Sequence, residues 1–216
     1  MRRVYRAGDL SESELAETWW EQFDRWFAAA VESGLLVEPN AMVLATAGED
    51  GRPGARTVLM KAVDRHGFVF YTNYRSGKAR ALAANPYAAL VFSWVPLERQ
   101  VLVGGSVRRI GREDTIRYFG SRPYRSRLAA WASPQSEVIP SREWLERAVA
   151  EVEARWPEGA DMPPPEHWGG FRVAPETVEF WQGRPDRLHD RLRYRLASPG
   201  EPVGQAGEWV VERLAP

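Results

Sequence analysis

The chain has 216 residues, of which 44% are hydrophobic, so one domain can build a substantial core without disulfides or a structural metal. Acidic and basic residues are equal in number, and a formal net charge of zero argues against a nucleic-acid binder held by a global positive field. The lack of cysteine excludes disulfide scaffolds, cysteine-ligated metals and thiol nucleophiles.

The N-terminal residues lack the signals of export or membrane insertion. Residues 1–5 are not followed by the apolar run of a secretory signal, and no apolar stretch reaches the roughly 20 residues of a membrane helix. We therefore expect a cytoplasmic protein that forms a single domain over residues 1–216.

A helix is predicted over residues 11–33. Ser11 and Glu14 have the spacing of a capping box, and Gly34 is a C-terminal stop. Between them, apolar side chains recur at helical intervals: Leu15, Trp19, Phe23, Trp26, Phe27 and Val31. The pattern indicates a helix that packs one face on a core.

The rest of the chain is rich in predicted strands. In chain order the strands are expected at 41–47, 55–63, 68–73, 88–94, 99–110, 170–173, 177–183, 188–196 and 208–214. Helices are expected at 77–85, 113–120, 126–132 and 141–156, before a proline-rich loop at 156–167. Most strands follow one another through turns, which favours a mainly β fold with α elements, an antiparallel β-barrel with packed helices.

Only two of the 29 basic residues are lysines, Lys61 and Lys78. Lys61 ends a predicted strand segment that contains Arg56, and side chains alternate along a strand. Arg56 and Lys61 would then lie on opposite faces and could serve two anionic sites separated by the sheet. Two solvated charges at the strand ends are the simpler interpretation.

Lys78 follows the strand predicted at 68–73, at the start of a helix. The hydroxyl groups of Tyr71 and Thr72, free backbone N–H groups and nearby basic side chains are suitable ligands for a phosphate. A polar turn before an amphipathic helix explains the same residues equally well.

Tyr118, Arg122 and Ser126 are spaced four residues apart. Because Pro123 interrupts a straight helix, a bend here could turn the three side chains toward one centre. An arginine can clamp a phosphate with two hydrogen bonds, and the two hydroxyl groups add neutral donors. By itself the pattern does not establish a phosphate site.

Arg187, His189 and Arg191 share one face if they lie in a strand. Three cationic or cationisable groups on a buried face are unfavourable without an anion. A solvated sheet edge is the alternative that needs no ligand. Asp190 would point to the other side and have a structural role.

In this order, these segments resemble the pyridoxine/pyridoxamine 5′-phosphate oxidase family. The resemblance runs from about residue 2 to the C-terminus, and its most specific segments are 56–61, 70–73, 97–101, 118–123, 168–172, 179–183, 187–191 and 213–216. It implies a homodimeric split β-barrel with FMN bound between the subunits. The implied reaction is the oxidation of pyridoxamine 5′-phosphate and pyridoxine 5′-phosphate by oxygen to pyridoxal 5′-phosphate, with release of hydrogen peroxide.

Carried over by position, the resemblance implies a flexible N-terminal segment at residues 1–10 and the site residues. The residues expected to contact FMN are Arg56, Thr57, Val58, Leu59, Met60, Lys61, Tyr71, Thr72, Lys78, Gln100, Gln135, Ser136, Trp181 and Arg191. The residues expected to contact the substrate are Arg2, Arg3, Val4, Tyr5, Lys61, Tyr118, Arg122, Ser126, Arg187, Leu188 and His189. Arg187 and His189 are the expected catalytic residues, which would orient the substrate and help its proton leave, and no metal is expected.

One position departs from the family pattern. The family usually has Arg-Lys where this chain has Gly77-Lys78, so one cation expected at the FMN phosphate is missing. Arg75 or Arg80 could reach the same phosphate instead. A charged hydrogen bond of this kind is worth roughly 1.5–3 kcal/mol, or about one to two decades in affinity.

Three other functions fit parts of the pattern. A flavin oxidase of the same barrel family that acts on phenazine precursors would share the FMN residues but lack the substrate-phosphate set. A deazaflavin-dependent reductase is a second alternative, and a non-catalytic carrier or sensor of FMN or pyridoxal phosphate is a third. The presence of Tyr118, Arg122, Ser126, Arg187 and His189 favours the vitamin B6 oxidase.

Overall fold

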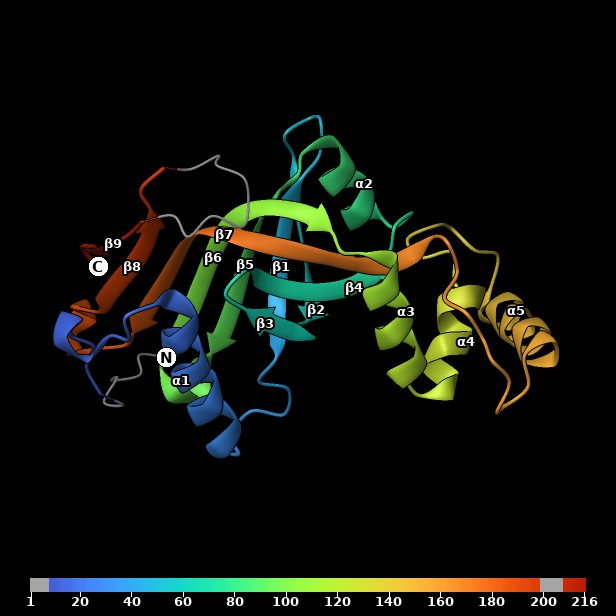
Figure 1. Ribbon diagram of the computed structural model, residues 1–216, viewed down its shortest axis with the longest axis horizontal. Coiled ribbons are helices and arrows are strands. Elements are labelled where there is room, and N and C mark those ends of the chain that lie inside the picture. Colours follow the sequence, from blue (N-terminus) through green and yellow to red (C-terminus); the bar gives the residue numbers. More distant parts are fainter. Residues whose placement is uncertain (1–7, 199–207) are drawn as a thin grey trace.

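The computed structural model describes residues 8–198 and 208–216, which form a mainly β fold with packed helices, as predicted (Figure 1). The strands are β1 (Ala41–Ala47), β2 (Pro53–Leu59), β3 (Ala62–Asp64), β4 (Gly67–Asn73), β5 (Tyr87–Trp94), β6 (Arg99–Arg109), β7 (Trp168–Gln182), β8 (Asp190–Leu196) and β9 (Trp209–Arg213). The helices are α1 (Trp19–Glu32), α2 (Gly77–Ala84), α3 (Arg112–Ser121), α4 (Tyr124–Ala132) and α5 (Arg142–Arg155). Short 3₁₀ turns are η1 (Glu12–Glu14), η2 (Val95–Leu97) and η3 (Pro185–Arg187).

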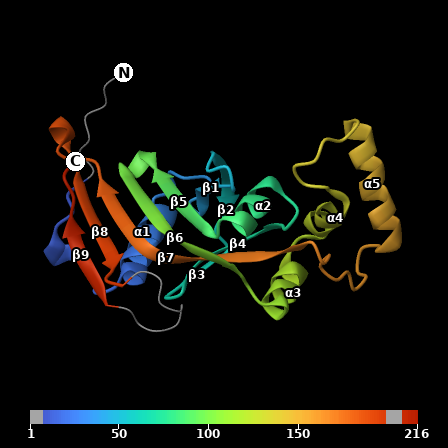
Figure 2. The ribbon, with the colours of Figure 1, turned by 90° about the horizontal axis from the view of Figure 1, so that it is seen from above.

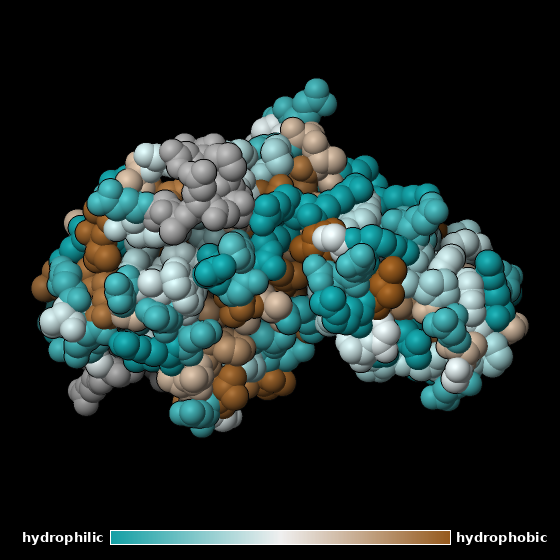
Figure 3. All heavy atoms as spheres, in the orientation of Figure 1, coloured by the Kyte–Doolittle hydropathy of each residue, from teal (hydrophilic) through white to brown (hydrophobic). Residues whose placement is uncertain are grey.

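One antiparallel sheet organises the molecule. Its order is β2-β1-β5-β6-β7-β4-β3, and β8 and β9 continue it from β7. The first half of β7 pairs with β4 and the second half with β8, so β7 joins the two parts of the sheet. Figures 1 and 2 show β8, β9 and α1 at one side of the molecule and α3, α4 and α5 at the other. In the space-filling view of Figure 3, these last helices form a separate protrusion, which we call the helical lobe.

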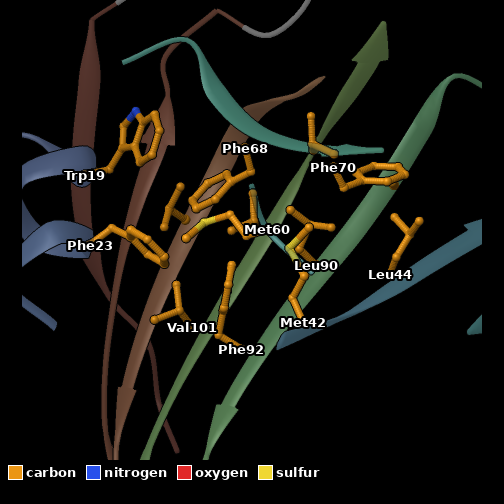
Figure 4. Packing of buried hydrophobic residues seen from close by; sticks show 14 of the residues in the cluster. Trp19, Phe23, Met42, Leu44, Met60, Phe68, Phe70, Leu90, Phe92 and Val101 are labelled. Atoms are coloured by element: carbon orange, nitrogen blue, oxygen red, sulfur yellow. The ribbon is translucent and has the colours of Figure 1, made fainter. Parts of the chain in front are cut away.

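The main core lies between α1 and the curled sheet. Trp19 and Phe23 of α1 are almost completely buried, and Phe23 meets Phe68 of β4 and Phe92 of β5 at ring distances of 4.9 and 5.0 Å (Figure 4). Burying such a side chain contributes roughly 1.5–3 kcal/mol to the stability of the fold. These contacts therefore hold α1 over the open face of the sheet. Within the described residues, no helix is both long and apolar enough to cross a bilayer.

The N-terminal helix is shorter than predicted. Residues 12–14 form only a 3₁₀ turn, and α1 starts after Thr18, whose side chain and Glu21 make the capping box of this helix. Ala16 between them has tertiary partners: its N–H donates to Gln22, and its carbonyl accepts from the Tyr194 hydroxyl. These bonds hold the segment extended, so the helix predicted from residue 11 is wrong in its first turns.

Two predicted strand boundaries are also wrong. The strand predicted at 55–63 is two strands, β2 and β3, and the strands predicted at 170–173 and 177–183 are one, β7. In the second case β7 runs on through Pro175, which pairs with Gly105 at the register shift between Gly104 and Gly105, where the ladder tolerates a residue without an N–H. Other predicted helices and strands outside residues 188–196 end within two residues of the observed limits.

Gly105 offers a test of this packing. A Cβ at Gly105 would overlap the carbonyl oxygen of Ala174 in β7, and backbone cannot move aside as a flexible side chain can. We expect Gly105→Ala to lower the free energy of unfolding by about 1–3 kcal/mol in urea titrations. Gly120→Ala is the matched control: it lies in α3 with no atom near its Cβ position, and should be neutral or stabilise by up to about 1 kcal/mol. Equal losses in both variants would contradict this account.

Candidate active site

A cavity of about 590 Å³ lies where β2, β4 and α2 meet the helical lobe and the start of β7. The predicted site residues that line it are Arg56, Thr57, Val58, Leu59, Lys61, Tyr71, Thr72, Lys78, Tyr118, Arg122 and Gln135. Sequence reasoning did not assign Asn73, Ala129, Ala130, Ser133 and Trp168, which also line it. Small residues carry no chemical signal in a sequence, but Trp168 stands in one of the segments that resemble the family.

The cavity concentrates positive charge. Four of its lining residues are cations, Arg56, Lys61, Lys78 and Arg122, and none of the described lining residues is Asp or Glu. Burial lowers the pKa of Arg56, Lys78 and Arg122, and the charge of Arg56 lowers the pKa of Lys78 further. Partly desolvated cations without a counter-charge favour the binding of an anion.

Lys78 and Arg56 belong to one polar group. The Lys78 Nζ lies 3.2 Å from Thr72 Oγ1 and 3.4 Å from Gln135 Oε1, and the Thr72 hydroxyl donates to the same Gln135 oxygen over 2.9 Å. Arg56 donates from Nη1 to Thr46 Oγ1 over 2.7 Å, which orients the guanidinium. The group offers ammonium, guanidinium and hydroxyl donors near the start of α2, a set of donors that suits a phosphate.

Arg56 and Lys61 line the same cavity, so the prediction that they serve sites on opposite faces of the sheet is wrong. The regular strand ends at Leu59, where β2 stops. The Met60 N–H then donates to Asn40 and the Lys61 N–H to Val69 of β4. This break resets the alternation of side chains, and Met60 turns into the hydrophobic core, away from the cavity lining.

Tyr118 and Arg122 form the second polar group. The rings of Tyr118 and Tyr71 stack with centroids 3.9 Å apart. Burial raises the pKa of Tyr71 to about 12 and also raises the pKa of Tyr118, so both phenols stay protonated and can donate at neutral pH. The Arg122 Nη1 is buried and has no hydrogen-bond partner among the described residues. A buried donor without a partner is costly, so this atom marks where an anion would bind.

Other predicted residues near the cavity stay outside its lining. Ser126 is half-buried in α4, and the exposed Ser136 lies beside Gly77, with its Oγ 3.9 Å from where a Cβ would be. Neither Arg75 nor Arg80 lines the cavity, and the Arg80 guanidinium donates to the Arg75 carbonyl instead. The structure therefore gives no support for their replacing the cation missing at Gly77.

The remaining predicted residues gather elsewhere, in a group that we call the far cluster: Gln100, Trp181, Arg187, Leu188, His189 and Arg191. Gln100 and Arg191 are the strand partners of Trp181 on its two sides, and the rings of Trp181 and His189 are 4.7 Å apart. Arg191 is paired with Glu179 over 2.7 Å.

The strand predicted at 188–196 begins only at Asp190. Arg187 ends η3 with a φ of 65°, and His189 precedes β8, so the prediction that they share a strand face with Arg191 is wrong. The His189 Nδ1 accepts the N–H of Arg184 over 3.0 Å, a bond that the turn makes possible.

The far cluster and the cavity lie at opposite ends of β7. Trp168 opens the strand at the cavity, and Trp181 lies near its other end. At about 3.3 Å per residue, the strand places them roughly 40 Å apart along its path. One copy of the chain does not bring the two sets together. The predicted contacts of Arg2, Arg3, Val4 and Tyr5 lie outside the described residues.

Comparisons with known proteins agree with the resemblance. Residues 27–156 match the family model of pyridoxamine 5′-phosphate oxidase, and residues 168–216 match that of the pyridoxine 5′-phosphate oxidase C-terminal dimerisation region, which supports a homodimer. Two relatives, from Streptomyces avermitilis and Frankia alni, are each named pyridoxine/pyridoxamine 5′-phosphate oxidase. They are 57% and 56% identical over all of this chain, covering 95% and 87% of their own lengths.

Solved structures share the fold. PhzG from Burkholderia lata 383, in complex with tetrahydrophenazine-1-carboxylic acid, has a TM-score of 0.84 at 29% identity, covering 94% of this chain and 95% of its own. An FMN-binding protein from Nostoc punctiforme has a TM-score of 0.71 at 20% identity, covering 94% of this chain and 100% of its own. The predicted split β-barrel is thereby confirmed. With two family models and full-length relatives in agreement, the chain belongs to the pyridoxine/pyridoxamine 5′-phosphate oxidase family and is an oxidoreductase.

Proposed function

We propose that the chain uses FMN to oxidise pyridoxamine 5′-phosphate and pyridoxine 5′-phosphate to pyridoxal 5′-phosphate. Two electrons and two protons leave the substrate and pass to oxygen, which becomes hydrogen peroxide. With the amine substrate, water supplies the aldehyde oxygen and ammonia is released. The observation that carries this proposal is the cavity with four cations and no carboxylate among its described lining residues. Two phosphate-bearing ligands would supply the missing negative charge. The cytoplasmic location stays a prediction from the sequence.

The residues at the start of α2 fit the phosphate of FMN. Lys78, Thr72 and Gln135 already contact one another, and the Arg56 guanidinium, which lines the same cavity, is held by Thr46. Charged and neutral donors therefore need little rearrangement to accept a phosphate, which lowers the entropic cost of binding. When bound, FMN supplies the two-electron oxidation that no side chain of the cavity can perform.

Arg122, Tyr118 and Lys61 fit the phosphate of the substrate. The unpartnered Nη1 of Arg122 gains a hydrogen bond when that phosphate binds, and the protonated Tyr118 phenol adds a neutral donor. Binding energy from this remote group can then fix the orientation of the reacting carbon. Such a site discriminates strongly against a substrate without the phosphate, because its buried donor would stay unpaired.

We further propose that a second copy of the chain brings its far cluster to the cavity. The two sets lie at opposite ends of β7, and the match to the dimerisation region covers the far-cluster residues from Trp181 onward. Because the His189 Nδ1 accepts the Arg184 N–H, the neutral ring carries its proton on Nε2. His189 would therefore act as a hydrogen-bond donor that orients the substrate, together with Arg187.

The alternative of a phenazine-type oxidase has support from the PhzG structure at 29% identity. The relatives at 56–57% identity and the unpartnered Arg122 donor, which suits a substrate phosphate, favour the vitamin oxidase.

The function is tested by an aerobic assay of the purified chain with added FMN, which follows aldehyde and hydrogen peroxide. We expect turnover of pyridoxamine 5′-phosphate and pyridoxine 5′-phosphate, and little turnover of unphosphorylated pyridoxamine. Arg122→Ala should raise KM for the phosphorylated substrates about 10- to 100-fold, because a charged hydrogen bond is lost. The absence of oxidation by the FMN-loaded wild type would refute the proposal.

Lys78→Met should affect cofactor binding and stability in opposite directions. We expect FMN affinity, measured by flavin fluorescence, to fall about 10- to 100-fold. Burial lowers the pKa of Lys78, so its charge opposes folding at neutral pH, a cost that disappears as pH rises past that lowered pKa. The FMN-free variant should therefore melt at a higher temperature than the wild type at pH 7. Arg52→Met, which removes an exposed cation, is the control, and unchanged FMN affinity in Lys78→Met would contradict the assignment.

Sharing of the site between subunits is tested by mixing defective chains. Random pairing of Arg122→Ala with His189→Ala makes about half of the dimers mixed, each with one intact site, so about a quarter of the wild-type kcat/KM should return. Mixing Arg122→Ala with Lys61→Ala should restore nothing, because both changes affect the same set. His189→Gln, which keeps an N–H donor, should lose less activity than His189→Ala. Failure of the first mixture to regain activity would place the whole site in one chain.

A further inference from the structure

The side chain of Arg122 is held by aromatic rings and not by a carboxylate. Its guanidinium carbon lies 4.7 Å from the centre of the Trp168 ring and 5.8 Å from that of Phe119. No Asp or Glu pairs with it in the part of the chain that the structure describes. The residue follows α3 directly and precedes Pro123, so its backbone belongs to the helical lobe.

Trp168 is a rigid support for this cation. It is 5% exposed, and it packs against Tyr71 in a near-parallel stack with centroids 5.3 Å apart and against Phe119 edge-on at 5.2 Å. Its backbone is held on both sides, since its N–H donates to Pro165 and its carbonyl accepts from Arg112. The indole comes from the start of β7, and it therefore fixes an arginine of the lobe relative to the sheet.

The chemistry of the support matters for the ligand. A carboxylate would orient Arg122, but it would occupy the same N–H donors that a phosphate needs. An aromatic face attracts the cation through its π electrons and leaves the N–H groups at the edge of the guanidinium available. The buried Nη1 without a partner is the donor that this arrangement leaves open.

We propose that Trp168 is a positioning residue that holds Arg122 ready for the substrate phosphate and so sets the preference for phosphorylated substrates. This inference rests on the proposed function. A purely structural role, in which Trp168 only packs the lobe against the sheet, would weaken every ligand of the cavity alike. The two roles therefore differ in whether the loss depends on the phosphate.

The test compares Trp168→Leu and Trp168→Phe, both loaded with FMN, with Trp131→Leu as the matched control. Trp131 belongs to the same lobe, packs against Trp156 at a tilt with ring centroids 4.5 Å apart, and does not line the cavity. Two readouts apply: KM and kcat for pyridoxamine 5′-phosphate and for pyridoxamine, and calorimetric binding of pyridoxal 5′-phosphate and of pyridoxal.

We expect Trp168→Leu to raise KM for pyridoxamine 5′-phosphate about 5- to 30-fold with kcat changed less than about twofold. Binding of pyridoxal 5′-phosphate should weaken by a similar factor, while binding of pyridoxal and the low turnover of pyridoxamine stay at their wild-type levels. Trp168→Phe keeps an aromatic face and disturbs the packing less than Trp168→Leu. Its KM for pyridoxamine 5′-phosphate should rise at most about fivefold. Trp131→Leu should leave the preference for the phosphate unaltered.

Four results would overturn the inference: no loss in either Trp168 variant, equal losses for ligands with and without the phosphate, a loss in Trp168→Phe as large as in Trp168→Leu, or the same loss in Trp131→Leu. The proposed function fails separately, when the wild type neither oxidises pyridoxamine 5′-phosphate nor binds pyridoxal 5′-phosphate. If the wild type oxidises pyridoxamine 5′-phosphate and binds pyridoxal 5′-phosphate, and the Trp168 variants do so equally well, the proposed function stands and the positioning role is rejected.

Discussion

The structure depends on holding four cations around one cavity without a neighbouring carboxylate among the described lining residues. Such charges repel one another and lose hydration when they are partly buried, so the fold must supply other means of placing them. For three of the four it does so with neutral groups: Thr46 orients Arg56, Thr72 and Gln135 contact Lys78, and Trp168 stacks on Arg122. The donors remain available, and an anionic ligand contributes the stabilisation that the free protein lacks.

The long strand β7 imposes the second constraint. It carries Trp168 at the cavity and Trp181 in the far cluster, at opposite ends of a single ladder. A rigid strand cannot fold back to join them, which separates the predicted cofactor and substrate residues into two groups. The match of residues 168–216 to a dimerisation region supports a homodimer, and a complete site in our proposal requires that second copy.

Elements of the fold that depend on neighbouring residues could be predicted from the sequence, whereas elements that depend on contacts between distant residues could not. Strands such as 41–47 and the short helix from Gly77 were predicted closely, because local propensity and nearby turns decide them. The prediction of a helix from residue 11 was wrong because the backbone of Ala16 forms hydrogen bonds with the side chains of Gln22 and Tyr194. Arg187 and His189 were assigned to a strand by their alternation with Arg191, but the turn at η3 ends before the strand begins.

The family, the mainly β class and eleven of the residues that line the cavity could be predicted from the sequence, because motif residues keep their order along the chain. The three-dimensional fold was needed to show that Arg56 and Lys61 line one cavity, that Met60 belongs to the core and that the far cluster lies away from them. It also showed the indole of Trp168 against Arg122. Such facts depend on where a strand breaks and on which distant side chains meet, and neither is recorded in local spacing.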